Sequence, residues 1–249
     1  MVSNKNILIA QGGGPTNVIN QSLVGIIQQE KKYKSKILGS INGVNGIINN
    51  RFISLNKISE NDLKTIANTP GAALGSTRDK PDKKYCKEIL KILENKQISK
   101  FYYIGGNDSS DSLRIISEYA KDTKYKLQCI HIPKTIDNDL VCNDHTPGFG
   151  SAAKYVAQLF SGINYDVKSL PGVYLGIVMG RHAGFLTAAS SLLKKENDDG
   201  PNLIYIPESP FEMNTFLNQV KSIFNKYGRC VIAISEGIQD KNKKLISQK

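Results

Sequence analysis

Two aspartates separated by one residue, Asp137 and Asp139, have the side chains in this sequence best suited to catalysis. They lie in the segment IHIPKTIDNDL (130–140), after a short apolar run, a proline and Lys134. Because like charges repel at close range, two carboxylates beyond one strand call for a reason. One could accept a hydroxyl proton while the other binds Mg²⁺. The alternative is a polar turn stabilised by its own aspartate side chains.

Three glycine-containing segments could bind a phosphate. ILIAQGGGPTNVIN (7–20) places three glycines between an apolar run and a helical pattern, where backbone N–H groups could approach an anion. GAALGSTR (71–78) ends in Arg78, whose planar guanidinium suits phosphate. FYYIGGNDSSDS (101–112) places a glycine pair before polar residues that could hold a phosphate and Mg²⁺. Taken singly, these segments also fit a tight turn, a solvated arginine and a helix N-cap.

Two later segments have the same layout. VMGRHAGFLTAASS (178–191) presents Arg181 after a glycine turn, and we interpret the neighbouring His182 as structural. VIAISEG (231–237) is an apolar run that ends in a glutamate, Glu236.

Short apolar runs alternate with amphipathic stretches along the chain. Strands are expected at 6–10, 35–41, 101–106, 127–133, 173–179, 202–207 and 229–237. Helices are expected after the first glycine segment and at 83–96, 111–121 and about 211–227. This alternation predicts an α/β fold with parallel sheets covered by helices. Such sheets bind ligands beyond the carboxyl ends of their strands, which is where nearly every segment described above lies.

Composition narrows the functional class. The 249 residues are 40% hydrophobic and 22% charged, as in a globular protein of one large or two smaller domains. The net charge of +11 comes mostly from scattered lysines without interleaved aromatics, which favours a solvated surface or phosphate substrates over nucleic acid. No apolar run is long enough to cross a membrane. Four unpaired cysteines and a start without a signal-peptide pattern predict a cytoplasmic location.

In this order, the six motifs resemble those of the phosphofructokinases, from ILIAQGGGPTN to VIAISEG. PKTIDND, MGRHAG and the GG-Asn-Asp-Ser loop are highly specific together. The resemblance implies a two-lobed α/β fold with mostly parallel sheets flanked by helices. It implies a phosphoryl-donor lobe at 1–140, a sugar-phosphate lobe at 141–249 and a cleft between them. The implied reaction transfers a phosphoryl group to the 1-hydroxyl of fructose 6-phosphate, with Mg²⁺ as cofactor.

The resemblance also implies a role for each site residue. Asp137 is the general base, Thr135 contacts the transferring phosphoryl group or the sugar, and Lys134 supplies charge. The donor residues are Gly13, Arg78, Gly106, Asp108 and Ser109. The sugar-phosphate residues are Met179, Gly180, Arg181 and Glu236. The Mg²⁺ ligands are Asp139, Asn107 and Asp108.

Two positions bear on the phosphoryl donor. ATP-dependent members of the family resemble GGDGS and PGTIDND, whereas this chain has Asp108 and Lys134 in place of the glycines. A carboxylate at Asp108 would crowd and repel the α-phosphate of ATP, and the ammonium of Lys134 can neutralise a free pyrophosphate end. Both substitutions resemble the pyrophosphate-dependent branch, which implies a reversible reaction. An ATP-dependent enzyme is the alternative, and the glycine spacing disfavours a dinucleotide oxidoreductase.

The chain departs from the family pattern in several places. Asn107 replaces a usual aspartate, Gly172 replaces an arginine that reaches a neighbouring subunit, and Ile177 replaces an acidic residue. Family members also continue well past the strand that carries Glu236, so we expect the C-terminal part to be truncated and the sugar-phosphate lobe incomplete. The resemblance implies a homo-oligomer, a dimer or a tetramer. A third hypothesis is a shortened, non-catalytic relative that binds sugar phosphate or a full-length partner.

Overall fold

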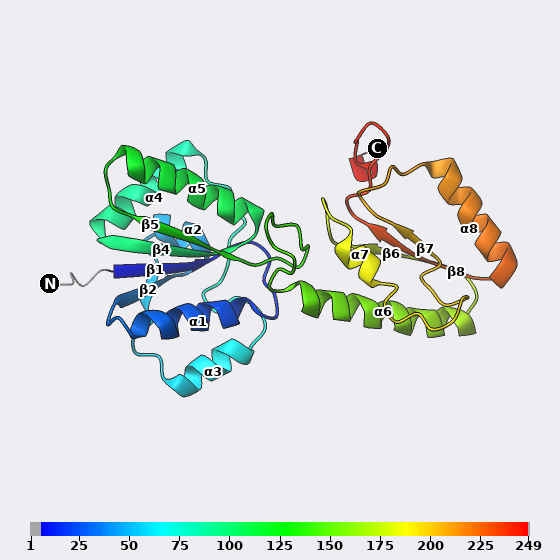
Figure 1. Cartoon of the computed structure of the whole chain (residues 1–249), viewed down its shortest axis with the longest axis horizontal. Helices are drawn as coiled ribbons and strands as arrows, with labels where there is room; N and C mark the ends of the chain where they lie inside the picture. Colours follow the sequence, from blue (N-terminus) through cyan, green and yellow to red (C-terminus); the bar gives the residue numbers. More distant parts are fainter. Residues whose placement is uncertain (1–5, 249) are drawn as a thin grey trace. The chain divides into compact units, whose positions relative to one another are not determined.

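The structure, a computed structural model, describes residues 6–248 and divides into two compact units (Figure 1). Unit 1 is Met1–Thr135 and unit 2 is Ile136–Lys249, so the division falls five residues before the boundary expected at 140. The first five residues, which belong to the start without a signal-peptide pattern, lie outside the described part. Each unit is described by itself below.

Unit 1 is built on a five-stranded sheet with the strand order β3-β2-β1-β4-β5. Its strands are β1 (Asn6–Gln11), β2 (Lys36–Ser40), β3 (Phe52–Ser54), β4 (Ile98–Gly105) and β5 (Gln128–Pro133). All neighbouring pairs are parallel except β2 and β3, which are antiparallel. The carboxyl ends of β1, β4 and β5 therefore meet at one edge, because parallel strands run in the same direction.

Helices cover both faces of this sheet (Figure 1). They are α1 (Ile19–Lys31), α2 (Gly43–Ile48), α3 (Glu60–Asn68), α4 (Lys83–Asn95) and α5 (Asn107–Asp122). One apolar cluster joins α2, α4 and α5 to the sheet, and a second joins α1 and α3 to its other face. Coverage on both faces explains why β1 is a continuous apolar run with five fully buried positions rather than an alternating pattern.

Unit 2 contains a three-stranded parallel sheet with the order β6-β8-β7. Its strands are β6 (Val173–Val178), β7 (Leu203–Tyr205) and β8 (Cys230–Ser235). Its helices are α6 (Phe149–Ser169), α7 (Phe185–Ala189), α8 (Met213–Tyr227) and the short 3₁₀ helix η1 (Ile246–Gln248). One apolar cluster joins α6 and α7 to β6 and β8, and a smaller one is centred on Phe211, Ile234 and Ile238.

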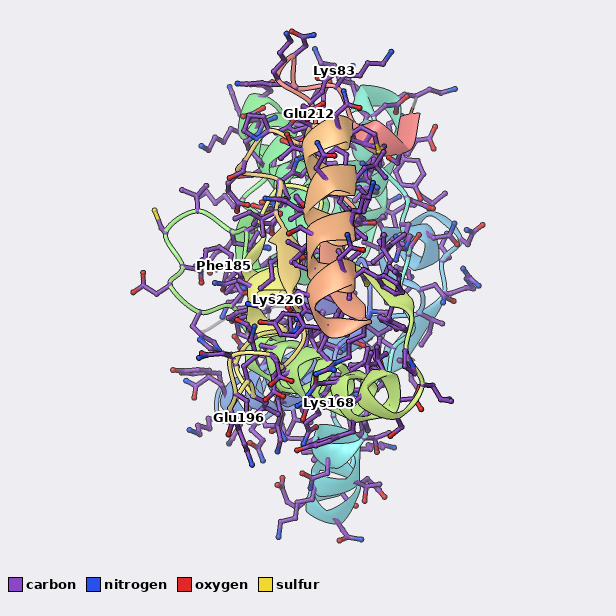
Figure 2. The ribbon with its side chains drawn as sticks, turned by 90° about the vertical axis from the view of Figure 1, so that its right-hand side faces the viewer. Lys83, Lys168, Phe185, Glu196, Glu212 and Lys226 are labelled. Carbon is purple, nitrogen blue, oxygen red and sulfur yellow. The ribbon has the colours of Figure 1, made fainter. Side chains whose placement is uncertain are left out.

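Helix α8 lies at the surface of unit 2 (Figure 2). Figure 2 shows it in the foreground, between Glu212 and Lys226, with side chains along its length. None of its residues is fully buried. The Glu212 carboxylate accepts hydrogen bonds from the N–H groups of Asn214 and Thr215, and Gly228 in the left-handed conformation ends the helix. The capping residues at its two ends therefore determine where α8 begins and ends more than burial of its side chains does.

The α/β fold with mostly parallel sheets flanked by helices is confirmed, and each strand predicted from the sequence overlaps an observed strand. The prediction missed several elements: α2, β3, α3 and α6, the last of which is the longest helix at 21 residues. Within residues 6–248, no helix is long and apolar enough to cross a membrane.

Candidate active site

The glycine loop after β1 is held tightly at the carboxyl edge of unit 1's sheet. Gly13 has a positive φ of 76°, which glycine adopts without steric cost. Its N–H donates to the Thr77 carbonyl at 2.9 Å, and the Ser76 hydroxyl donates to the Gly13 carbonyl at 2.6 Å. A Cβ on Gly12 would lie 2.5 Å from the Tyr103 hydroxyl oxygen, so no larger residue fits there. The loop is therefore a fixed, close-packed surface.

Lys134 follows β5 and brings a positive charge to this loop. Its residue is only 3% exposed, and its Nζ donates to the Gly14 carbonyl at 2.7 Å. The same Nζ would lie 3.2 Å from a Cβ on Gly13. Its own N–H donates to the Gly105 carbonyl at 3.1 Å, which fixes the backbone. A buried ammonium needs oxygens that compensate its charge, and the Gly14 carbonyl supplies one of them.

The second glycine pair opens helix α5 at the same edge. A Cβ on Gly105 would clash with the Ser109 hydroxyl, and one on Gly106 would lie 3.5 Å from the Lys134 carbonyl. Gly106 is the N-cap residue and provides no side-chain hydrogen bond. The first-turn N–H groups of α5 have no acceptor within the helix, and with the helix dipole they suit an anion.

Ser109 and Asp108 on the first turn of α5 lie in different surroundings. Ser109 is buried beside Tyr103: burial raises the pKa of Tyr103 to about 12, and its hydrogen bond with Ser109 works in the opposite direction. The Asp108 carboxylate is exposed and pairs with the Lys80 ammonium at 3.1 Å. The helix therefore presents a carboxylate at its N-terminal end.

Two buried amides, which the sequence reading did not single out, position the Arg78 loop. The Gln11 side chain, fully buried at the end of β1, donates to the Asn20 side-chain oxygen at 3.0 Å and accepts from the Leu74 N–H at 2.9 Å. Asn20 also accepts from the Ala73 N–H at 2.9 Å. These bonds fix the segment that precedes Arg78, whose side chain is exposed and lies near Gly14. The sequence feature that could have indicated this role is Gln11, a glutamine at the end of an otherwise apolar strand.

His131 on β5 is a second positioning residue that the sequence reading missed. Its Nε2 lies 2.8 Å from the Gly105 carbonyl oxygen, to which it donates. Burial lowers the pKa of His131, which favours the neutral ring. The Gly105 carbonyl thus accepts from two groups, the ring of His131 and the N–H of Lys134, and the turn into α5 is held from the neighbouring strand.

In unit 2, the aspartate pair flanks a buried asparagine. Asn138 is 6% exposed and has a positive φ of 58°, which asparagine tolerates better than most residues. Its side-chain oxygen accepts from the N–H of Thr146 at 2.8 Å, and its amide donates to the Asp144 carbonyl at 3.1 Å. Asp137 and Asp139 on either side are half-buried. The loop is therefore pinned at its centre by Asn138, with the two carboxylates beside it.

The MGR and Glu236 segments meet at the carboxyl edge of unit 2's sheet. Gly180, with a φ of 126°, directs its N–H to the Glu236 carboxylate at 3.4 Å. The Ser235 hydroxyl donates to the Gly180 carbonyl at 2.6 Å, and a Cβ on Gly237 would clash with the Arg181 carbonyl. Met179 is half exposed and Arg181 is exposed. The predicted sugar-phosphate residues thus form one cluster within this unit.

Each unit therefore gathers its own set of predicted site residues. Those of unit 1 follow β1, β4 and β5 or the Arg78 loop: Gly13, Arg78, Gly106, Asn107, Asp108, Ser109, Lys134 and Thr135. Those of unit 2 lie in the aspartate loop or follow β6 and β8: Asp137, Asp139, Met179, Gly180, Arg181 and Glu236. Glycine loops and cationic side chains at the carboxyl edges of parallel sheets are typical of proteins that bind phosphate groups.

Comparison with known proteins gives the family. The phosphofructokinase family model matches residues 6–249, so the chain belongs to the phosphofructokinase family. The chain is 58% identical to the pyrophosphate–fructose 6-phosphate 1-phosphotransferase of Rhodospirillum rubrum, over 94% of this chain and 58% of the relative. It is 40% identical to the protein of the same name from Xanthomonas campestris, over 99% of this chain and 61% of the relative. The resemblance to the pyrophosphate-dependent branch is thereby confirmed.

A solved structure agrees in fold. The crystal structure of a pyrophosphate-dependent phosphofructokinase from Marinobacter aquaeolei matches with a TM-score of 0.85 and 37% sequence identity. The match covers 95% of this chain and 61% of that one. The chain thus spans about three-fifths of the length of these relatives.

Proposed function

We propose that the chain transfers a phosphoryl group from pyrophosphate to the 1-hydroxyl of fructose 6-phosphate, a reversible step of glycolysis. Residues of unit 1 bind the donor, and residues of unit 2 bind the sugar phosphate. The names of the relatives from Rhodospirillum rubrum and Xanthomonas campestris support this reaction. Phosphoryl transfer depends mainly on positioning and on charge around the transferring group, which is what the two sheet edges offer.

The observation that carries the choice of donor is the buried ammonium of Lys134. It lies against the glycine loop, with its Nζ 2.7 Å from the Gly14 carbonyl oxygen. A free pyrophosphate end carries more charge than the corresponding bridging phosphate of ATP, so a fixed cation at this position favours pyrophosphate. Arg78, exposed beside the same loop, adds a second cation for the donor.

Asp108 also supports pyrophosphate as the donor, because its carboxylate disfavours ATP. Its carboxylate stands on the first turn of α5, where an α-phosphate and its nucleoside would otherwise find N–H groups and a small residue. Repulsion between this carboxylate and an extended nucleotide disfavours ATP. The Lys80 ammonium lies 3.1 Å from this carboxylate.

Asp137 acts as the general base in this proposal. It accepts the proton of the sugar 1-hydroxyl, while Thr135 contacts the transferring phosphoryl group or the sugar. The anchoring of Asn138 to Thr146 and Asp144 supports a fixed position for the neighbouring Asp137. Met179, Gly180 and Arg181 contact the sugar phosphate, and Glu236 binds the sugar hydroxyls.

The residues fit a Mg²⁺ ion that arrives with its phosphate ligand. No group of three or more histidine, cysteine, aspartate or glutamate side chains gathers as a metal cage within residues 6–248. Mg²⁺ in phosphoryl-transfer sites uses one or two carboxylates together with substrate phosphates and water, so no such cage is required. Asp108, Asn107 and Asp139 would hold the ion, which would neutralise charge on the phosphates.

The proposal includes a homo-oligomer, a dimer or a tetramer, located in the cytoplasm. Light scattering on the purified chain tests this part independently of activity.

A coupled assay with fructose 6-phosphate and each donor in turn tests the function. We expect turnover with pyrophosphate and at most weak turnover with ATP. Turnover with ATP and none with pyrophosphate would contradict the assignment of pyrophosphate as the donor. No turnover with either donor, together with measurable binding of fructose 6-phosphate, would favour the non-catalytic relative.

A further inference from the structure

A pocket of about 640 Å³ opens within unit 2. Its lining comes from the segments that follow the three strands: Arg181 and His182 follow β6, Glu208 follows β7, and Lys243 and Lys244 follow β8. Three of these side chains are basic, one is an imidazole and one is a carboxylate. The pocket therefore has a net positive charge and lies where parallel sheets bind ligands.

The single carboxylate is engaged with the backbone. Glu208 accepts a hydrogen bond from the Gly184 N–H at 2.8 Å, next to the start of α7. Arg181, Lys243 and Lys244 outnumber this one carboxylate in the lining of the pocket. The side chains that line the pocket therefore attract an anionic ligand.

The two lysines stand on an anchored hairpin. Gln239 pairs with Leu245 across it, and the Gln239 amide donates to the Pro207 carbonyl at 3.1 Å, which joins the hairpin to the segment after β7. Asp240 accepts from the Lys244 N–H at 3.0 Å and closes the tip. Such bonds reduce the conformational freedom that ligand binding would otherwise have to remove.

Lys243 occupies an unfavourable backbone conformation. Its φ is +61°, in the left-handed region that glycine, asparagine and aspartate adopt at lower cost than lysine. The adjacent Asn242 would suit this conformation better. Lys34 and Lys124 have the same conformation, so the position of Lys243 in the pocket, and not the conformation alone, carries the argument.

We propose that this pocket binds the phosphate group of a small phosphate ester, with Lys243 and Lys244 as charge donors beside Arg181. His182, interpreted from the sequence as structural, lines the same pocket. The inference deepens the proposed function, because it names two further residues for binding the sugar phosphate. It concerns equilibrium binding and so can succeed or fail apart from turnover.

Calorimetric titration of the whole chain with fructose 6-phosphate, inorganic phosphate and fructose tests the proposal. The variants are Lys243→Gly, Lys244→Ala and the control Lys241→Ala, an exposed lysine of the same hairpin that does not line the pocket. Lys243→Gly is the sharpest variant, because glycine relieves the backbone strain while it removes the ammonium. We expect its melting temperature to stay the same or rise, while affinity for fructose 6-phosphate falls about tenfold.

Lys244→Ala should weaken binding by a similar factor, Lys241→Ala should not, and Lys243→Arg should restore affinity. Binding of fructose 6-phosphate should also weaken with added salt, and fructose should not bind. Inorganic phosphate that binds as tightly as fructose 6-phosphate would show that the phosphate group alone is recognised, and tighter binding of the ester would show that its sugar contributes. Wild-type affinity in both Lys243→Gly and Lys244→Ala, or no binding of either phosphate compound to the unaltered chain, would overturn the proposal.

Discussion

Both units present their motif residues at the carboxyl edge of a parallel sheet, but the two sheets differ in how far their strands are buried. In unit 1, β1 is buried along five of its six residues, whereas the first five residues of β6 in unit 2 alternate between exposed and partly buried positions. The donor-side motifs therefore rest on a sheet covered on both faces, and the sugar-side motifs rest on a sheet with one apolar face open along β6.

The helices show the same difference. Helix α1 of unit 1 buries seven residues, whereas in unit 2 helix α6 buries six and helix α8 buries none. Tyr174 on β6 packs against Phe160 of α6, so the open face is the opposite one, which carries Val173, Leu175 and Ile177. Local stability follows buried apolar contact, so unit 1 should open less readily than unit 2.

The largest expected effect comes from one substitution made in both sheets. Ile9 on β1 is fully buried, and Ile177 on β6 is 72% exposed. Ile9→Ala should lower the free energy of unfolding by about 2–5 kcal/mol, because it removes buried methyl groups and leaves a cavity. Ile177→Ala should cost only about 0.5 kcal/mol, as expected for an exposed site. Urea titrations of the two variants measure the difference.

An equal loss of unfolding free energy in Ile9→Ala and Ile177→Ala would contradict the difference in burial between the two sheets. It would mean that β6 is covered in solution, and a change in mass by light scattering in Ile177→Ala would identify a second copy as the cover. A small loss of unfolding free energy in Ile9→Ala would instead show that the core of unit 1 can collapse around the missing atoms.

The next effect tests the catalytic part of unit 2. Asp137→Ala should lower turnover at least about a hundredfold, because the sugar hydroxyl loses its proton acceptor. Asp144→Ala is a matched control: its side chain is exposed, and the backbone carbonyl that anchors Asn138 is retained. The coupled assay gives turnover, and circular dichroism confirms folding. Near-normal activity in Asp137→Ala would refute its assignment as the base.

A smaller effect is expected at the donor side in unit 1. Asp108→Gly combined with Lys134→Gly should shift the ratio of kcat/KM for pyrophosphate to that for ATP by about tenfold toward ATP, which corresponds to about 1.4 kcal/mol. Both the repelling carboxylate and the attracting ammonium are removed. Lys80→Ala is the control, since it removes the partner of Asp108 and leaves both donor-selecting residues in place. An unchanged donor ratio in the double variant would count against the steric and electrostatic argument.

The sequence predicted the part of the fold that repeats a simple pattern. Buried parallel strands give continuous apolar runs, and glycine or charged residues mark their carboxyl ends, so β1, β4 and β8 were found together with the motifs that follow them. Helix α6 was missed although it is the longest, because its segment FGSAAKYVAQLFSGINYDVKS carries no motif and lies between two segments that do. The short antiparallel β3 was missed because three residues give no readable alternation.

The contacts that support the site residues could not be predicted from the sequence. The bond from Gln11 to Asn20 and the bond from His131 to Gly105 join residues from different elements, and only the fold brings them together. Likewise, the sequence analysis did not single out the segment after Glu236, whereas its hairpin places Lys243 and Lys244 in a pocket. Residue types in a motif indicate chemistry, but the partners that position them depend on tertiary structure.

The smallest expected effect is a pH dependence in unit 2, where polar contacts compensate for the limited burial. Asp199 accepts from the Lys168 ammonium at 2.6 Å, from the N–H groups of Lys195 and Glu196 at 3.0 Å, and from the Asn164 amide at 2.9 Å. The Lys168 ammonium first, and then the two backbone N–H groups, hold the pKa of this carboxyl far below its ordinary value. Asp199 therefore stabilises the folded state when it is ionised.

The sign of the pH effect follows from this lowered pKa. The stabilising contribution of Asp199 is fully present above the ordinary aspartate pKa of about 4, and it is lost as the pH falls toward the lower pKa of the folded state. Asp199→Asn should therefore lower the melting temperature by about 2–4 °C at pH 7 and at pH 5, and the gap to the unaltered chain should narrow at pH 3. Asp79→Asn in unit 1 is the comparison, because Asn45 and Tyr85 also donate to its carboxylate. A gap for Asp199→Asn that stays constant from pH 7 to pH 3 would show that shape rather than charge makes this residue stabilising.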